Sequence, residues 1–168
     1  MKTLFLILTV MIFVGCATTD KTVKTAKSFN SFQSVAPKKA IILQKGENRY
    51  SCAICGMNLP SFYKTNHAAN TKNGEKQYCS LHCLVYDNEI NHTDLMNVKV
   101  VDTDTLQFIP ALKAYYVTGS KMPATMSSVS KYAFSTKEAA EKFSKLYGGK
   151  VMGFYDAYDI AIKDFTKK

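Results

Sequence analysis

The chain has 168 residues, which is enough for one compact domain or two very small ones. Lysine and arginine outnumber aspartate and glutamate by 22 to 13, so the formal net charge is +9. These basic residues are dispersed along the chain, a pattern that disfavours nucleic-acid binding. The expected attraction is to an anionic membrane surface or an acidic partner, and simple solubility is the alternative.

The first fifteen residues have the features of a secretory signal. Lys2 is followed by an apolar run over positions 4–14 that only Thr9 interrupts, and this run is too short for a membrane-spanning helix. Gly15 followed by Cys16 resembles the bacterial lipobox, in which the cysteine is lipidated and becomes the new N-terminus. We therefore expect an exported lipoprotein, anchored to a membrane through Cys16 and facing the periplasm. The alternative is an ordinary signal peptide with an unmodified Cys16.

Residues 16–48 are rich in threonine, serine and lysine and lack a sustained apolar period. This composition is typical of a flexible linker. The sequence therefore predicts a tether over residues 16–48 that holds a folded domain away from the membrane.

The first folded unit is expected over residues 49–118. A strand ends near Tyr78, Ser80 is a plausible helix N-cap, and residues 81–90 form one or two helical turns. A strand begins near residue 97, and a further strand over 111–119 ends at Gly119.

The second unit is expected over residues 119–168 and follows the same plan. A strand over 129–135 leads to a helix, with Ser135 and Glu138 as a capping box and Gly148-Gly149 as its end. Residues 150–162 are predicted to form a strand. The sequence thus indicates an α+β fold of two related ββαβ units with a seam near Gly119.

Four cysteines in the predicted folded part form two close pairs. Cys52 and Cys55 form a C-x-x-C motif, and Cys79 and Cys83 lie at i and i+4, which places both sulfurs on one face of a helix. This spacing is typical of a four-thiolate metal site, with zinc as one candidate ion. Two disulfides are the structural alternative in an oxidising compartment. His82 falls beside the shared face, so its role as a ligand is doubtful.

Methionine favours a softer ion than zinc. Met57 follows Cys55 by two positions, and Met122 and Met126 lie in a predicted loop, where a role as core filler is less expected. Thioether sulfur suits Cu(I) better than Zn²⁺. Met96 and Met152, in contrast, are predicted to pack in the core.

These motifs together resemble a known family. The order is CGM at 55–57, AYYVTGS at 114–120, a loop ending in Met126, AFS at 133–135, a helix with alanines, and GG at 148–149. Over residues 50–162 this arrangement resembles NosL, a family of copper-binding lipoproteins associated with the assembly of nitrous oxide reductase.

The resemblance implies a pair of ββαβ units akin to the organomercurial lyase MerB and a lipidated Cys16. It also implies that Cu(I) is held by Cys55, Met57 and Met126 and passed to a client copper enzyme without catalysis. Two features depart from the family pattern. Cys79 and Cys83 are additional to its core motif, and Ser127 stands where glycine usually follows the loop methionine.

Two other functions remain open. The first is an interaction module that zinc stabilises through Cys52, Cys55, Cys79 and Cys83. The second, less expected, is an enzyme of the organomercurial lyase kind, which needs an acid beside its thiols. Asp87, Asp94 and Asp102 are available for that role, but no motif places them.

Overall fold

The structure, a computed structural model, describes residues 31–166. The predicted signal peptide and Cys16 lie outside the described residues. None of the helices within residues 31–166 has the length and apolarity required to cross a bilayer.

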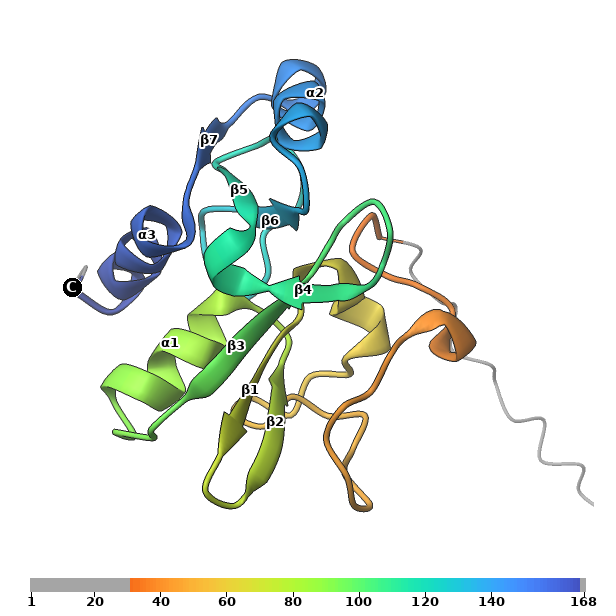
Figure 1. Cartoon of the computed structure of the whole chain (residues 1–168), viewed down its shortest axis with the longest axis vertical. Helices are drawn as coiled ribbons and strands as arrows, with labels where there is room; N and C mark the ends of the chain where they lie inside the picture. The colour runs from red at the N-terminus through yellow and green to blue at the C-terminus, as the bar shows by residue number, and fades with distance from the viewer. Residues whose placement is uncertain (1–30, 167–168) are drawn as a thin grey trace, which may run out of the picture.

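Two antiparallel sheets, each with its own helix, make up most of the domain (Figure 1). The first unit consists of β1 (His67–Thr71), β2 (Gly74–Tyr78), α1 (Leu81–Glu89), β3 (Met96–Val101) and β4 (Phe108–Pro110). The second consists of β5 (Tyr115–Thr118), β6 (Lys131–Phe134), α2 (Lys137–Tyr147) and β7 (Lys150–Met152). Three short 3-10 helices and a last α-helix complete the described elements: η1 (Pro37–Lys39), η2 (Pro60–Thr65), η3 (Ala111–Lys113) and α3 (Phe154–Thr166).

The strand orders confirm the predicted repeat. The first sheet has the order β2-β1-β3-β4 and the second β6-β5-β7, so in each unit the first strand lies between the second and the third. In each unit the helix, α1 or α2, follows two paired strands and precedes a third strand, as the sequence predicts. A parallel bridge between Asp102 and Ala133 joins the two sheets.

The boundary between the units lies earlier than the sequence predicts. The sequence pattern places residues 115–118 at the end of the first unit, but β5 pairs with β6 and with β7 of the second sheet. The last elements of the first unit are β4 and η3. Gly149 fixes how closely β7 approaches β5, because a Cβ at this position would come within 2.7 Å of the carbonyl oxygen of Thr118.

The caps of the two main helices follow from local sequence. Ser80 Oγ accepts a hydrogen bond from Cys83 N–H and begins α1, as predicted. For α2 the predicted cap is wrong by one residue: Thr136 accepts from Ala139 N–H, whereas Ser135 Oγ donates to Asp102 at 2.7 Å. The helix ends at Tyr147, and Gly148, with φ of +75°, is its C-cap, as predicted.

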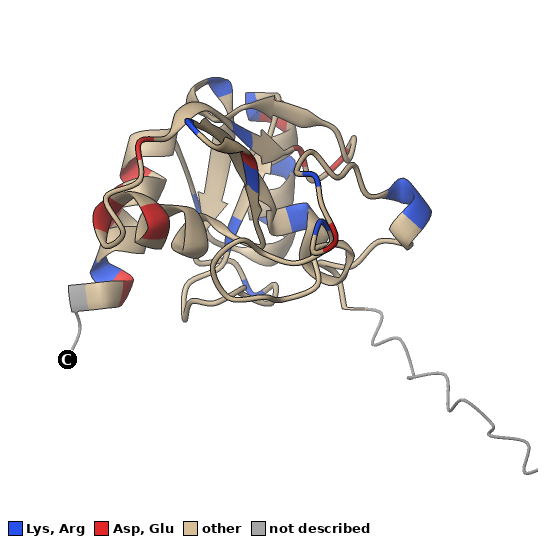
Figure 2. Ribbon diagram, turned by 90° about the horizontal axis from the view of Figure 1, so that it is seen from below, with Lys and Arg blue, Asp and Glu red and all other residues tan. Residues whose placement is uncertain are grey.

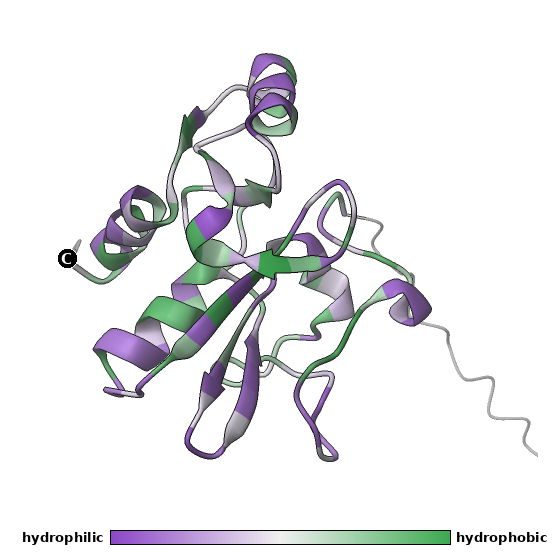
Figure 3. Cartoon of the chain, in the orientation of Figure 1, coloured by the Kyte–Doolittle hydropathy of each residue, from purple (hydrophilic) through white to green (hydrophobic). Residues whose placement is uncertain are grey.

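The predicted strand over residues 150–162 is correct only at its start. β7 ends at Met152, and α3 follows. Apolar residues of α3 recur at helical spacing on one face, visible beside its polar face in Figure 3. That face packs mainly on the core of the first unit, through Phe154, Ala157, Tyr158, Ala161, Ile162 and Phe165. Phe154 also meets Tyr116 of β5, with ring centroids 6.0 Å apart.

The predicted tether is also wrong over the part that the structure describes. Of residues 16–48, those from 31 onward lie against the domain. Gln33 is buried, Phe32 packs in the core of the second unit, and Ile42 packs against the core of the first. Leu43 N–H donates to the side chain of Gln77 at 3.0 Å. These contacts are made by isolated side chains and backbone groups, so no apolar period signals them.

The methionines predicted to lie in the core divide between core and surface. Met152 is partly buried against the core of the first unit, as predicted. Met96 is 54% exposed, because it stands at the solvent-facing start of β3.

A buried histidine joins the two units. His67 of β1 places Nδ1 3.0 Å from the Thr65 carbonyl oxygen and Nε2 3.0 Å from the hydroxyl of Tyr116 on β5. The pKa of His67 is lowered to about 4, chiefly by burial and also by the positive charge of Lys131, against a raising effect of the Thr65 carbonyl. The imidazole is therefore neutral in the folded protein at neutral pH.

We predict that the metal-free domain loses stability between pH 6.5 and pH 4 through this residue. In the unfolded chain His67 is protonated near pH 6.5, whereas in the folded protein it is protonated only near pH 4. The contribution of neutral His67 to the free energy of unfolding is therefore fully present above pH 6.5 and is lost as the pH falls to 4. The shift corresponds to about 3 kcal/mol at 1.36 kcal/mol per pKa unit. Denaturant unfolding at several pH values should show a flatter profile for His67→Gln. The exposed His92, as His92→Asn, is the control, and equal profiles for the wild type and His67→Gln would contradict the assignment.

Candidate metal centre

Four cysteine side chains from two parts of the first unit meet at one point. The Sγ atoms of Cys52, Cys55, Cys79 and Cys83, hereafter the cysteine cluster, all lie within 4.8 Å of one another. All four are free thiols. The structure thus confirms the predicted grouping of the two cysteine pairs.

The first pair lies in a tight loop between two paired residues, Ser51 and Asn58. Cys52 N–H donates to the Met57 carbonyl oxygen at 2.8 Å, and its own carbonyl oxygen accepts from Gly56 N–H at 3.0 Å. Gly56 has φ of +75°, a backbone conformation that favours glycine and closes the turn.

The second pair comes from the junction of β2 with α1. Cys79 directly follows β2, and Cys83 lies in the first turn of α1 after the N-cap Ser80. Ala53 N–H donates to the Gln77 carbonyl oxygen at 3.0 Å, which holds the loop of the first pair beside this strand end. The N-terminus of α1 carries a partial positive charge that favours thiolates nearby.

The spacing of the sulfurs suits a single ion. Cys79 Sγ lies 3.5 Å from Cys55 Sγ and 3.7 Å from Cys83 Sγ. An ion bound tetrahedrally at about 2.3 Å from each sulfur would separate neighbouring sulfurs by about 3.8 Å. The cluster therefore needs only small adjustments to surround one metal ion.

The cluster is closed on one side and open on the other. Cys52, Cys79 and Cys83 are buried, with exposures of 4%, 0% and 1%, whereas Cys55 is only partly buried. Exchange with solvent or with another ligand is therefore easiest at Cys55.

The thiols influence one another's ionisation. Hydrogen bonding from Cys79 and Cys83 lowers the pKa of the Cys52 thiol, and the bond to Cys52 is the main cause that raises the pKa of Cys79. One thiolate is thus stabilised by protonated neighbours. Removing further protons within the same small volume requires a bound cation, so metal binding at this cluster releases protons.

The methionines considered as ligands differ in burial and in surroundings. Met57 is partly buried beside the cysteine cluster, against the core of the first unit. Met126 lies in the second unit, is 42% exposed, and has a left-handed φ of +56°. Met122 packs against the core of the second unit. Ligation by Met57 and Met126 stays a prediction.

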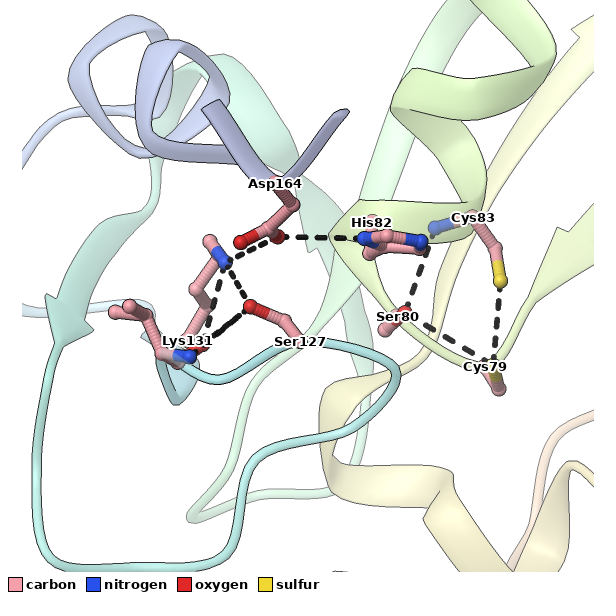
Figure 4. A network of polar contacts seen from close by, with 8 residues as sticks. Cys79, Ser80, His82, Cys83, Ser127, Lys131 and Asp164 are labelled. Atoms are coloured by element: carbon pink, nitrogen blue, oxygen red, sulfur yellow. Dashed lines mark hydrogen bonds and ion pairs between the residues drawn. The ribbon is translucent and has the colours of Figure 1, made fainter. Parts of the chain in front are cut away.

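His82 turns away from the cysteine cluster (Figure 4). Its Nδ1 lies 3.3 Å from Asp164 of α3, and its ring packs on Phe165 with centroids 4.4 Å apart. Asp164 also pairs with the buried Lys131 at 3.2 Å. His82 therefore joins α1 to α3 rather than extending the cluster.

A buried hydrogen-bond relay that the sequence does not reveal reaches the cluster from the second unit. Thr65 Oγ1 donates to the Cys79 carbonyl oxygen at 2.7 Å and lies 2.9 Å from Thr125 Oγ1. Gln33 Nε2 donates to Thr125 Oγ1 at 2.7 Å. The residue after Thr125 is Met126, so the loop with this methionine is linked to the backbone of a cluster cysteine.

Lysine and arginine are spread over many elements, while several acidic residues lie along the helices (Figure 2).

Within the part of the chain that the structure describes, fold and site define a thiol-rich domain of two ββαβ units with one group of residues able to hold a metal ion.

The comparisons with known proteins agree with this class. The NosL family model matches residues 44–161, well over half of the chain, and the chain therefore belongs to the NosL family. Its structure is similar to the crystal structure of the copper chaperone NosL from Shewanella denitrificans, with 26% sequence identity and a TM-score of 0.54 over 72% of this chain and 96% of that one. The solution structure of apo-NosL from Achromobacter cycloclastes matches at 20% identity and a TM-score of 0.40, over 54% of this chain and 82% of that one. No curated protein sequence matches.

We predict that Cys55 is the first thiol of the cluster to react with iodoacetamide in the reduced, metal-free protein. It is the accessible member, whereas the other three react only after local opening, which should slow them by at least about tenfold. Timed quenching and peptide mass mapping measure the four rates, with the denatured protein as the control. A buried cysteine that reacts as fast as Cys55 would contradict the described geometry.

Proposed function

We propose that this protein is a Cu(I)-binding metallochaperone, anchored through Cys16 to the outer side of a bacterial membrane, that delivers copper to an exported copper enzyme. Nitrous oxide reductase is the expected client. The proposal is supported by the family to which the chain belongs and by its similarity to the copper chaperone NosL from Shewanella denitrificans. The single observation that carries it is a cluster of four free thiols with one accessible member.

The arrangement suits a protein that holds a soft ion and then releases it. Thiolate is a soft ligand that matches Cu(I), and the three buried cysteines keep the ion away from water. An incoming ligand can attack at the side of Cys55 and replace the protein's sulfurs one at a time. Copper then passes by ligand exchange, and no catalytic group is required.

The methionines would favour copper over zinc. Met57 stands two positions from Cys55, and the loop of Met126 is tied to Cys79 through Thr125 and Thr65. Thioethers add soft donors for Cu(I) that do not titrate, whereas Zn²⁺ gains little from them.

A zinc-stabilised interaction module is the second candidate. The sulfur separations of 3.5 and 3.7 Å also suit a tetrahedral Zn²⁺ site, whose formation would stabilise the first unit. The two candidates differ in what they require of the methionines, because a zinc site of four thiolates needs neither Met57 nor Met126.

Two of the three carboxylates considered for an enzyme of the organomercurial lyase kind have structural partners instead. Asp87 is buried and bonded to Lys76 and Tyr78, and Asp102 accepts from Ser135. Asp94 is exposed. These settings support a carrier in preference to an enzyme.

We predict that Cys55→Ser weakens Cu(I) binding most, because it removes a charged ligand at the accessible edge. Met57→Leu and Met126→Leu keep volume and apolarity, so they should leave folding nearly intact but weaken Cu(I) binding. Anaerobic titration of the purified full-length protein against a chromogenic Cu(I) chelator measures each affinity. Met96→Leu, at an exposed position in β3, is the matched control.

The same variants separate the two candidates when zinc is titrated. If the protein is a copper chaperone, Met57→Leu and Met126→Leu should bind zinc as the wild type does but bind Cu(I) more weakly. If both bind Cu(I) as tightly as the wild type, the shared methionine site is wrong and the thiols alone form the site.

The membrane anchor is tested separately. We predict that Cys16→Ala moves the protein from the membrane to the soluble fraction of cells, because Cys16 is the acyl acceptor that directly follows the signal-like segment. Fractionation and immunoblotting measure the distribution, with Cys55→Ser as the control for a cysteine outside the anchor. Retention of Cys16→Ala in the washed membrane pellet would refute the lipoprotein assignment.

A further inference from the structure

The segment 31–35, hereafter the strap, makes specific contacts although it lies before the range that matches the family model, residues 44–161. It bridges the two units. On the first unit, Val35 N–H donates to the Pro60 carbonyl oxygen at 3.0 Å, and the Gln33 carbonyl oxygen accepts from Lys64 N–H at 3.1 Å. Both partners belong to η2, so the strap runs along this helix.

On the second unit, the strap packs through an aromatic side chain. The ring of Phe32 meets Tyr132 edge-on, with centroids 5.4 Å apart, and lies among the residues of the second core. Lys64 Nζ stands 4.0 Å from the centre of the same ring. Phe32 is thus held between the two units.

The side chain of Gln33 clamps the methionine loop, defined here as residues 120–130. It is 3% exposed, and its Nε2 lies 3.1 Å from the carbonyl oxygens of Pro123 and Ala124 and 2.7 Å from Thr125 Oγ1. One amide group therefore contacts three successive residues that lead directly to Met126. Such a contact fixes the direction in which the loop leaves residue 125.

Met126 itself is held in an uncommon conformation. Its φ of +56° lies in the left-handed region, which residues other than glycine and asparagine seldom adopt. On its other side, Ser127 Oγ accepts a hydrogen bond from the buried Lys131 Nζ at 2.8 Å. Both neighbours are held by buried partners, so the backbone at Met126 is held in this conformation.

We propose that Gln33 is a positioning residue for copper binding, which sets the methionine loop so that Met126 can reach the metal held at the cysteine cluster. The relay from Gln33 through Thr125 and Thr65 ends on the Cys79 carbonyl oxygen, so one buried chain of hydrogen bonds connects the strap, the loop and the cluster. This inference rests on the proposed function, because it assigns a role to Gln33 only if Cu(I) binds with Met126 as a ligand. It also gives the segment between the anchor and the family domain a part in the metal site.

The test is a double-mutant cycle on the purified full-length protein with Cu(I) as the probe. Gln33→Ala should weaken Cu(I) binding about fivefold, the equivalent of about 1 kcal/mol, because the loop loses its fixed orientation. In the Met126→Leu background the same change should have no further effect, since the ligand it positions is already gone. Ser34→Ala is the matched control, because Ser34 Oγ donates to Ser31 within the strap and to no other residue of the described part of the chain. Thr125→Val is a second, nearly isosteric variant, which breaks the relay should Gln33→Ala fail to fold.

The outcomes separate this inference from the proposed function. Wild-type affinity in both Gln33→Ala and Thr125→Val, with Met126→Leu weakened, would overturn the positioning role and leave the chaperone intact. Equal weakening by Gln33→Ala in both backgrounds would also overturn it, because a general loss of stability acts whether or not Met126 is present. Failure of the wild type to bind Cu(I) would instead refute the proposed function.

Discussion

Everything at the metal centre follows from the gathering of four thiols within 4.8 Å in a largely buried place. Several thiolates cannot share so small a volume without a cation, because like charges at this distance in a poorly solvated site repel strongly. Without metal, hydrogen bonding among the thiols lowers the pKa of Cys52 and raises the pKa of Cys79 and Cys83. A bound metal ion would relieve this repulsion, and its release would restore the protons to the thiols. A site of this kind binds metal tightly but depends on an external ligand for release, and the accessible edge at Cys55 provides the place for that ligand.

The other elements of the fold hold the cysteine cluster in place. The loop of Cys52 and Cys55 is held beside the end of β2, and the N-cap of α1 fixes the turn between Cys79 and Cys83. The second unit, as the structure describes it, contributes the methionine loop and no cysteine. Buried contacts such as that between His67 and Tyr116 lock its position against the first unit. The C-terminal helix α3 strengthens this joint, because it follows the second unit in sequence but packs on the core of the first.

Much of this arrangement could be predicted from sequence where the signal is local or periodic. The C-x-x-C pair and the i, i+4 pair indicate the cluster, Ser80 indicates the start of α1, and the repeated plan indicates two ββαβ units. Prediction fails where a tertiary partner decides the outcome. Ser135 and Thr136 are both suitable caps, and only the contact with Asp102 removes the first from that role.

The two larger errors have separate physical causes. Residues 154–165 repeat their apolar positions at helical spacing, but their aromatic and β-branched content favours a strand, and packing against the first unit decides for the helix. Residues 31–48 have the composition of a linker because their contacts are single side chains in irregular backbone. Gln33 is the clearest case in which the sequence alone gives no prediction. It is a polar residue in a polar segment, and nothing indicates its burial until its three acceptors on a distant loop are known.

The identity of the ion bound by the cysteine cluster is the central claim, and direct competition tests it. The purified full-length protein would be given equimolar Cu(I) and Zn²⁺ under anaerobic, reducing conditions, desalted, and analysed for both metals by mass spectrometry. The account predicts one copper per chain and displacement of zinc, because the accessible thiol and the thioethers together favour the softer ion. One zinc per chain with copper left in solution would contradict it and would make the cluster a structural zinc site.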